Sequence, residues 1–420
     1  MNDVVPGALM PPLDAALRLA ALRADFPILQ RQVRGKPLAY LDNAATTLKP
    51  VSVVEAVTRH YREEVANIHR AAHFLSEQAT ARYEECRGKV RRLLNARDDS
   101  EIVFTSGTTA AINLVAHSWG RGQLRAGDEV VVTGMEHHAN IVPWQMLRAS
   151  TGVVLKVIPF LPDGSLDMEA AGRLIGPRTR LVSFVHTSNT LGTINPAAEL
   201  VARARAVGAA TLVDAAQAVA HGPVDVQALG CDFLAFSGHK LYGPTGVGVL
   251  YGRRERLDAM PPITGGGDMI FSVTWEKTLY ADPPARFEAG TPHICGVLGL
   301  GAAIEWVTAQ GWGLLRGQEE LLLREGTRLL ADIPGLRLVG TSPRKCAILS
   351  FVVDGIHAYE LGAFLDAEGI AIRTGHHCAQ PVMDALGLLA TARASLGPYN
   401  TEEDLERLAA GIREAQRRLA

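Results

Sequence analysis

The chain has 420 residues, of which 47% are hydrophobic and 20% charged, and its formal net charge is −2. This composition is typical of a globular protein with a large core, and a prior of about 150 residues per domain predicts two or three domains. The balanced charge and the lack of an apolar run near the roughly 20 residues that cross a bilayer argue against nucleic-acid and membrane partners.

The N-terminal stretch MNDVVPGALMPPLDAALRLAALRADFP has an acidic residue near its start. It lacks a basic segment followed by an apolar one, so it does not have the pattern of a signal peptide, and we expect a cytoplasmic protein. From Asp14 onward the sequence predicts an amphipathic helix. We predict that residues 1–30 form a helical segment that packs on a small C-terminal domain.

Seven short apolar runs follow along the chain. They are EIVFT (101–105), DEVVVT (128–133), VVLKVIPF (153–160), RLVSFVH (180–186), ATLVDA (210–215), DFLAFS (232–237) and VGVLYG (247–252). Stretches with helical spacing lie between most of them, at 110–119, 140–150 and 196–209. This alternation predicts an α/β fold with a mainly parallel seven-stranded sheet covered by helices on both faces, within a large domain of residues 31–290.

Polar residues gather where these runs end, which is where parallel sheets bind their ligands. They are Thr108, Thr109, His137, Asn189, Asp214, Gln217, Ser237, His239 and Lys240. Taken singly, each has an ordinary explanation: Thr108 as a helix cap, for example, or Lys240 as a solvated loop lysine. Their recurrence at successive strand ends is better explained by one shared ligand.

Pyridoxal 5′-phosphate has the features that this set of side chains would recognise. Its phosphate suits Thr and Ser hydroxyls at a helix N-terminus, and its flat ring suits an imidazole. Its ring nitrogen suits the carboxylate of Asp214, which favours the protonated form, and its aldehyde suits the amine of Lys240.

The C-terminal part, residues 291–420, predicts a smaller α+β domain. Its expected elements are a helix from 297 to 310 and beyond, strands at 335–340, 346–353 and 370–374, and helices at 357–369 and 402–419. It contains the segment RTGHHCAQP (373–381), in which Cys378 follows two histidines. From the residues alone, Cys378 is open to interpretation as a metal ligand, a nucleophile, half of a disulfide or a cysteine without a particular role.

Five cysteines, an odd number without a CxxC pair, argue against a disulfide framework and indicate a reducing compartment. A metal site at Cys378 lacks a second Cys/His cluster, so we expect no metal. The other four thiols are predicted to be small buried hydrophobes; they are Cys86, Cys231, Cys295 and Cys346.

Eleven strings in chain order carry a resemblance to a known family. They are LDNAATTLKP, NIHRAAHFLSEQAT, FTSGTTAAINLVA, MEHHANIVPWQ, HTSNTLGT, DAAQAVAH, FSGHKLYGPTG, GGGDMI, FEAGTP, RTGHHCAQP and TARASLGPYNT. The sequence resembles the group II cysteine desulfurases of the Suf and Csd type, in the class V aminotransferase superfamily, over essentially the whole chain after the N-terminal segment. The resemblance implies the fold of fold type I enzymes that depend on pyridoxal 5′-phosphate.

The resemblance also implies roles for individual residues. Lys240 would bind the cofactor aldehyde and move the substrate Cα proton, Asp214 would pair with the ring nitrogen, and His137 would stack on the ring. Other residues would complete the cofactor site: Gln217 on the ring oxygen, and Thr108, Thr109, Ser237, His239 and Thr291 on the phosphate. Thr291 would come from the second subunit of a homodimer.

The substrate side of the site is assigned by the same resemblance. Arg393 would bind the substrate carboxylate bidentately with help from Asn189, and Cys378 would be the nucleophile. Arg373 and His69 resemble further active-site residues. Arg373 and the two histidines before Cys378 are candidates to favour its thiolate, and the compact loop implies a restrained thiol.

The implied activity converts L-cysteine to L-alanine and leaves a persulfide on Cys378. The sulfur would pass to a SufE-like or SufU-like acceptor and on to iron–sulfur cluster assembly, and selenocysteine lyase activity is implied as well. Two alternatives are another enzyme with the same cofactor, such as an aminotransferase, and a non-catalytic scaffold. Cys378 argues against the first, because transamination does not use a thiol, and Lys240 with Asp214 argues against the second.

Overall fold

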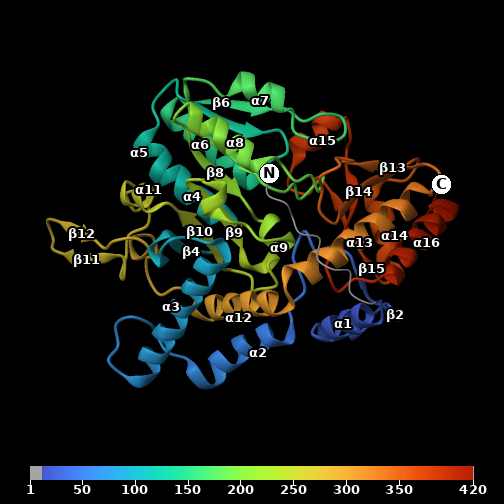
Figure 1. The fold of residues 1–420 in the computed structure, drawn as a ribbon, viewed down its shortest axis with the longest axis horizontal. Helices are drawn as coiled ribbons and strands as arrows, with labels where there is room; N and C mark the ends of the chain where they lie inside the picture. Colours follow the sequence, from blue (N-terminus) through green and yellow to red (C-terminus); the bar gives the residue numbers. More distant parts are fainter. Residues whose placement is uncertain (1–11, 420) are drawn as a thin grey trace.

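The computed structural model describes residues 12–419, and a seven-stranded sheet forms the centre of its larger part (Figure 1). The strand order is β4-β10-β9-β8-β7-β5-β6. The strands are β4 (Ile102–Thr105), β5 (Glu129–Thr133), β6 (Val154–Ile158), β7 (Thr179–Val185), β8 (Ala210–Asp214), β9 (Phe233–Ser237) and β10 (Gly248–Gly252). Strand β10 is antiparallel to both neighbours, and the five strands from β9 to β6 are parallel.

These strands are the seven apolar runs of the sequence, each within two residues of its expected ends, so the predicted sheet is confirmed. The three helices expected between them also form, as α4 (Thr108–Val115), α6 (Val142–Thr151) and α8 (Ala197–Ala206). The apolar runs were a reliable signal because a parallel strand buried on both faces carries hydrophobic residues at nearly every position.

The helices pack on both faces of this sheet. Side chains alternate between the faces along a strand: Ile102 and Phe104 of β4 lie in one hydrophobic cluster, and Val103 lies in another. The first cluster includes residues of α3 (Phe74–Leu94), α8 and α12 (Ile294–Gln310), and the second includes residues of α4 and α6. The sheet is therefore buried on both faces, and the strand ends are left to form a site.

The remaining helices and short strands connect or cover these layers. The helices are α1 (Pro12–Ala24), α2 (Val51–Arg59), α5 (Arg121–Gln123), α7 (Met168–Leu174), α9 (Ala218–His221), α10 (Val226–Leu229), α11 (Arg254–Asp258), α13 (Trp312–Ala331), α14 (Ala358–Ala367), α15 (Gln380–Leu386) and α16 (Glu402–Leu419). The short strands outside the larger sheets are β1 (Gln32–Val33), β2 (Lys36–Pro37), β3 (Ala39–Tyr40), β11 (Ile270–Val273), β12 (Thr278–Tyr280) and β15 (Ile370–Ala371).

The smaller part is an α+β unit around a four-stranded antiparallel sheet with the order β13-β14-β17-β16. Its strands are β13 (Leu336–Val339), β14 (Ile348–Val353), β16 (Arg373–Gly375) and β17 (Thr391–Ser395). Strand β17 was missed by the sequence analysis because TARAS contains no run of large apolar residues. This missed strand carries Arg393, and β16 beside it carries Arg373.

Three segments link the two parts. Strand β3 pairs with β15, and Ala39 lies in the hydrophobic cluster of the smaller part. Helix α12 packs against α2 and α3. In the last turn of α1, Arg23 donates to the Tyr399 carbonyl and pairs with Asp404 of α16. The domain boundaries at residues 30 and 290 stay predictions, and residues 1–11 of the predicted N-terminal segment lie outside the described residues.

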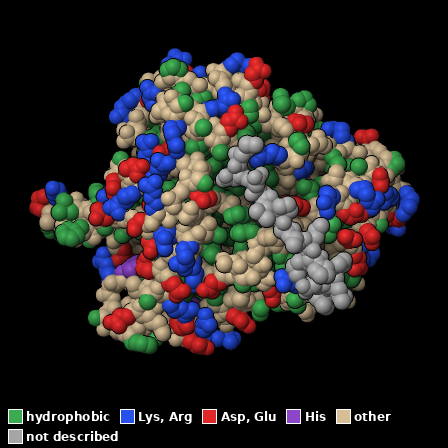
Figure 2. Space-filling model, in the orientation of Figure 1, with side chains coloured by type: hydrophobic (Ala, Val, Ile, Leu, Met, Phe, Trp, Pro, Cys, Tyr) green, Lys and Arg blue, Asp and Glu red, His purple; other side chains and the backbone are tan. Residues whose placement is uncertain are grey.

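A hairpin of β11 and β12 projects from the larger part (Figure 1) and carries exposed hydrophobic side chains (Figure 2). Trp275 at its turn is fully exposed, and Phe271 is 81% exposed. Elsewhere on the same face, basic and acidic side chains are intermingled (Figure 2).

Within residues 12–419, no single helix is both long enough and apolar enough to span a membrane. Helices α12 and α13 have that length and composition only when taken together, and the pair is bent by 80°.

Candidate active site

A cavity of about 180 Å³ lies where the carboxyl ends of the parallel strands face the smaller part. Twelve of the fourteen predicted site residues line it. From the strand ends come Thr108, Thr109, His137, Asn189, Asp214, Gln217, Ser237, His239 and Lys240, and from the smaller part come Arg373, Cys378 and Arg393. Residues that are up to 285 positions apart in sequence are thus brought to one site, as the strand-end rule predicts.

Lys240 and Asp214 are the two charged groups at the centre of the large-domain side. Burial lowers the pKa of Lys240 to about 8, although the Asp214 carboxylate acts in the opposite direction. Burial also raises the pKa of Asp214, although an N–H from Ala216 at 2.9 Å favours its charged form. A buried carboxylate in this state gains stability from a cationic partner in the cavity.

Thr108 and Ser237 form a polar cradle at the N-terminus of α4. The Thr108 amide donates to Ser237 Oγ at 2.8 Å, and the two hydroxyl oxygens are 2.7 Å apart. The preceding Gly107 has φ 151°, and an added Cβ would lie 3.3 Å from Ser237 Oγ. A side chain at this position would be strained, so the glycine leaves the helix N-terminus open to an anion.

His137 and His239 face the cavity as neutral imidazoles. Burial, followed by the charge of Lys240, lowers the pKa of each to about 4. His137 Nδ1 accepts the Ala139 amide at 3.0 Å, which fixes its ring at the start of a short helical turn. The buried Nδ1 of His239 has no hydrogen-bond partner among the described residues, so it is free to meet a polar ligand atom.

Arg393 is 1% exposed and is held from two directions. It donates to the Asn189 carbonyl at 2.8 Å and to Asp42 Oδ1 at 3.0 Å, while its buried Nε has no partner among residues 12–419. Arg373 lies directly opposite Arg393 in the β16–β17 pair. Two guanidinium groups side by side, one with a free N–H, form a site for a carboxylate.

Cys378 is the only exposed thiol among the described residues, and the other four cysteines are buried as predicted. Its loop is pinned to the larger part by three hydrogen bonds across the cavity. The Cys378 carbonyl accepts the His138 amide at 2.7 Å, His138 Nε2 accepts the Gln380 amide at 3.0 Å, and Asn189 Nδ2 donates to the His377 carbonyl at 2.7 Å.

The backbone of this loop has the left-handed conformation at two consecutive non-glycine residues, His377 and Cys378, with φ values of 52° and 55°. Such a conformation persists only where the surroundings impose it. The His377 ring is buried and bonds to Thr391 Oγ1 at 2.8 Å. Burial, with Arg393 and Arg373 nearby, lowers the pKa of His377 far below its usual range, so this ring is a neutral neighbour of the thiol. The basic side chains that line the cavity with Cys378 are Arg373, Arg393 and Lys240.

His69 and Thr291 do not line the cavity. His69 is exposed, and its Nε2 lies 3.0 Å from Glu84 Oε1. Thr291 is exposed within this chain, and its predicted role in the site of a second subunit stays a prediction.

Three groups were missed by the sequence analysis. Asp42 holds Arg393, the Ala44 carbonyl accepts from Gln217 Nε2 at 2.7 Å, and a buried Glu136 carboxyl accepts from the Val185 amide beneath His137. Burial raises the pKa of Glu136 to about 8. The strings LDNAATT and MEHHAN contained these residues, but a string does not show which distant groups they contact.

The fold and the site are those of a known family. Residues 39–408 match the model of the aminotransferase class-V family. The chain is 52% identical over 399 residues to a cysteine desulfurase of Dickeya dadantii, with 95% of this chain and 97% of that protein covered. It is 53% identical over 395 residues to a cysteine desulfurase of Synechococcus elongatus, covering 94% of this chain but 63% of that longer protein.

Among solved structures, the chain is similar to the cysteine desulfurase CsdA from Escherichia coli. The TM-score is 0.88 at 41% sequence identity, and 96% of this chain and 99% of that chain are covered. This chain belongs to the aminotransferase class-V family and, within it, is similar to group II cysteine desulfurases.

Members of this family use pyridoxal 5′-phosphate, and the cavity fits that cofactor. The fit rests on the buried Asp214 carboxylate, an amine with a lowered pKa, an open helix N-terminus beside two hydroxyls, and a buried His239 Nδ1 without a partner among the described residues. The carboxylate matches the ring nitrogen, and the amine matches the aldehyde. The helix N-terminus, with its hydroxyls, and His239 match the phosphate.

Proposed function

We propose that this protein is a cysteine desulfurase that depends on pyridoxal 5′-phosphate and converts L-cysteine to L-alanine, leaving the sulfur as a persulfide on Cys378. One observation carries the proposal: Lys240, Asp214, Arg393 and Cys378 line one cavity. An aminotransferase would not need the thiol, and a scaffold would not need the buried lysine and aspartate.

We assign cofactor binding to the large-domain side of the cavity. Asp214 would face the ring nitrogen, His137 the ring, Gln217 the ring oxygen, and the Thr108 and Ser237 cradle the phosphate. When bound, pyridoxal 5′-phosphate supplies an electron sink for the carbanion at the substrate Cα. On the opposite side, Arg393 binds the substrate carboxylate, assisted by Asn189.

Lys240 moves the proton at the substrate Cα. An amine whose pKa is about 8 has a substantial neutral fraction at neutral pH, which an ordinary lysine lacks, and only the neutral form accepts a proton. Because Lys240 and Arg393 line the same cavity of about 180 Å³, a substrate whose carboxylate is bound by Arg393 keeps its Cα close to the amine.

Cys378 takes the sulfur. Its thiolate attacks the sulfur of the substrate, a new S–S bond forms, and the substrate C–S bond breaks with its electron pair on the carbon side. After protonation at carbon the product is L-alanine, and Cys378 carries the persulfide, so no external oxidant is needed. Arg373 and Arg393 line the same cavity as Cys378.

The destination of the sulfur and the assembly state are part of the same proposal. The pinned loop supports a need for a protein acceptor, of SufE-like or SufU-like type, that comes to the thiol and delivers sulfur to iron–sulfur cluster assembly in the cytoplasm. The exposed Thr291 and the apolar hairpin around Trp275 support a homodimer. Light scattering of the purified protein tests the dimer, and sulfide release with each acceptor type tests the partner.

The central test compares the holoenzyme with its Cys378→Ala variant in L-cysteine and a thiol reductant. We expect L-alanine and sulfide in equal amounts from the unchanged protein, a protein mass increased by one sulfur atom before reduction, and both lost in Cys378→Ala by a factor of about 100 or more. Cys295→Ala, a matched change of a buried thiol, keeps the activity. Sulfide release that survives Cys378→Ala would refute the persulfide step.

Selenocysteine distinguishes the two related activities. We expect the holoenzyme to release selenide from L-selenocysteine, and we expect Cys378→Ala to keep more of this activity than of its desulfurase activity, because selenium is the better leaving group. Equal losses with both substrates would contradict a selenocysteine lyase activity that is independent of the thiol.

A further inference from the structure

A second and larger cavity, of about 540 Å³, adjoins the active-site cavity. It is bounded by the end of α9, by α13 and by the segment before β14. Thr187 lines both cavities. None of the chemistry assigned above uses the groups in this second cavity, although it contains a thiol, an imidazole and a carboxylate.

Cys346, His221 and Glu319 interact with one another in this cavity. His221 Nδ1 lies 2.7 Å from Glu319 Oε2, and the Cys346 thiol is the second group that interacts with the His221 ring. Burial lowers the pKa of His221, but Glu319 and Cys346 together raise it well above its usual value. A thiol next to an imidazole that a carboxylate orients is the arrangement of an activated cysteine nucleophile.

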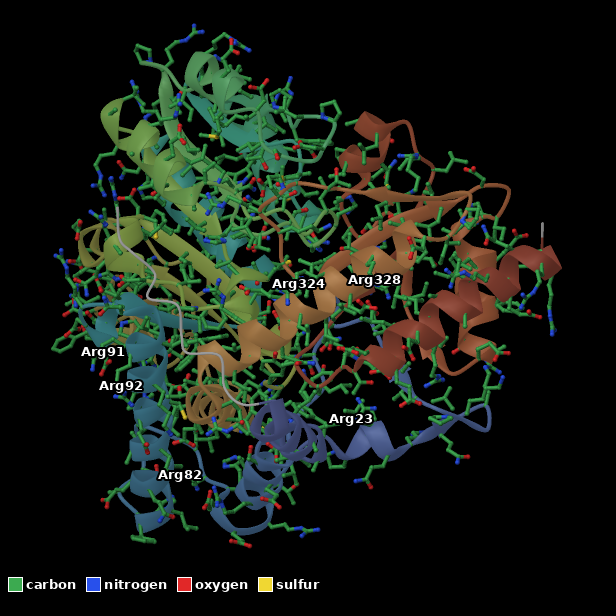
Figure 3. All side chains as sticks on the ribbon, turned by 45° about the vertical axis from the view of Figure 1, so that its right-hand side comes forward. Arg23, Arg82, Arg91, Arg92, Arg324 and Arg328 are labelled. Atoms are coloured by element: carbon green, nitrogen blue, oxygen red, sulfur yellow. The ribbon has the colours of Figure 1, made fainter. Side chains whose placement is uncertain are left out.

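The same cavity is lined by four cationic side chains, Arg316, Arg324, Arg344 and Lys345. Arg316 pairs with Glu320 at 3.4 Å, but neither Arg324 nor Arg344 forms an ion pair with any carboxylate in the described part of the chain, residues 12–419. Arg324 extends from α13, one turn before Arg328 (Figure 3). Unpaired guanidinium groups beside a thiol favour a ligand that carries carboxylates.

We propose that Cys346, His221 and Glu319 form a thiol-modification site that reacts with small disulfides bearing carboxylate groups, which Arg324 and Arg344 draw into the second cavity. The Cys346 thiolate attacks one sulfur of the disulfide, and a mixed disulfide forms on Cys346. The original S–S bond breaks and the other half leaves as a thiolate, which takes up a proton. The incoming disulfide is the oxidant, so atoms and electrons balance. The site is separate from Cys378 and does not rest on the proposed function.

The first test uses the unchanged holoenzyme and three small disulfides that differ in charge: dithiodiglycolate (anionic), hydroxyethyl disulfide (neutral) and cystamine (cationic). Modification of each cysteine is followed by mass spectrometry of its peptide, and each rate is divided by the rate of the same disulfide with N-acetylcysteine. We expect the normalised rate at Cys346 to be about tenfold higher for the anionic than for the cationic disulfide. We also expect Cys346 to react faster than buried Cys231 with the anionic reagent.

Two sets of variants test the assigned groups. Arg324→Gln with Arg344→Gln is expected to remove the preference for the anionic disulfide. Glu319→Gln is expected to slow modification of Cys346 by all three disulfides by about tenfold, since the imidazole loses its carboxylate. Glu320→Gln is the matched control, because Glu320 lines the same cavity and pairs with Arg316 rather than with His221. It is expected to keep the rate with the neutral disulfide.

Two results would overturn the proposal: a rate at Cys346 no higher than at Cys231, or a rate at Cys346 that does not depend on the charge of the disulfide. Both come from the unchanged protein, so they remain decisive even where a variant folds poorly.

Discussion

The two walls of the active-site cavity are fixed in different ways. On the large-domain wall, Asp214 and His137 are each held by a backbone amide two residues away in sequence: Asp214 accepts from the Ala216 amide, and His137 accepts from the Ala139 amide. On the small-domain wall, Arg393 is held by Asp42, which is 351 positions away.

The large-domain wall carries the groups that we assign to the cofactor, and the small-domain wall carries those that we assign to substrate binding and to the thiol. On the large-domain wall, the backbone contacts that hold Asp214 and His137 do not involve the smaller part. On the small-domain wall, the Cys378 loop is positioned only when the two parts of the chain are in contact, because Asn189 and His138 of the larger part hold this loop. Changes on the first wall should therefore abolish the reaction, and changes to the cross-cavity contacts should alter substrate binding and thiol reactivity by smaller factors.

The largest effect is expected from Lys240→Ala. Removal of the amine eliminates the group that moves the Cα proton, and we expect desulfurase activity to fall by about 10³-fold or more. Activity is measured as L-alanine release, and retention of the cofactor is followed by its absorbance. Lys36→Ala, which breaks a half-exposed ion pair with Glu368 and does not touch the cavity lining, serves as the control and is expected to keep full activity. Substantial alanine release from Lys240→Ala would contradict the assignment of the Cα proton transfer to Lys240 on the large-domain wall.

The sequence predicted the large-domain wall of the cavity well and the small-domain wall only in part. Strand periodicity placed all seven strands, and the strand-end rule then brought Asp214, Lys240 and His137 together without knowledge of long-range contacts. The small-domain groups came from the family resemblance. Their supports, such as Asp42, were missed because an ion pair between distant segments depends on the path of the whole chain.

The pH dependence of cofactor loading tests the large-domain wall. Only the neutral amine of Lys240 attacks an aldehyde, so loading of the apoprotein with pyridoxal 5′-phosphate should rise with pH through about 8, the lowered pKa, rather than through 10.5. This predicts a rate increase of about tenfold between about pH 7 and pH 9, whereas the ordinary amine of N-acetyl-lysine should show an increase of about 100-fold in the same buffers.

Asp214→Asn sharpens this prediction. Because Asp214 raises the pKa of Lys240, its neutralisation should move the loading midpoint below 8, whereas Asp366→Asn on the surface should leave the midpoint unchanged. A midpoint near the ordinary lysine value in the unchanged protein would contradict the lowered pKa.

Asp42→Asn tests how Arg393 is positioned. The substitution removes the charge that orients a nearly fully buried guanidinium, so we expect the KM for L-cysteine to rise by about tenfold while kcat changes by less than about threefold. Steady-state kinetics separate the two constants. Asp366→Asn breaks an exposed pair with Arg34 and should change neither. A loss confined to kcat would assign Asp42 to the chemistry instead of to substrate binding.

The smallest effect is expected from Thr391→Val, which removes the hydroxyl bonded to the His377 ring. Since His377 Nδ1 has no partner among the described residues, the substitution leaves both ring nitrogens of a buried imidazole unsatisfied, and the free energy of unfolding should fall by about 1–3 kcal/mol. The loosened loop should let iodoacetamide alkylate Cys378 about threefold faster, with a smaller change in kcat. Thr327→Val removes a comparable hydroxyl bond within α13, to the Leu323 carbonyl, and should lower stability without changing alkylation of Cys378. If both variants raise the alkylation rate equally, the restraint on the thiol comes from global stability and not from the contacts that pin its loop.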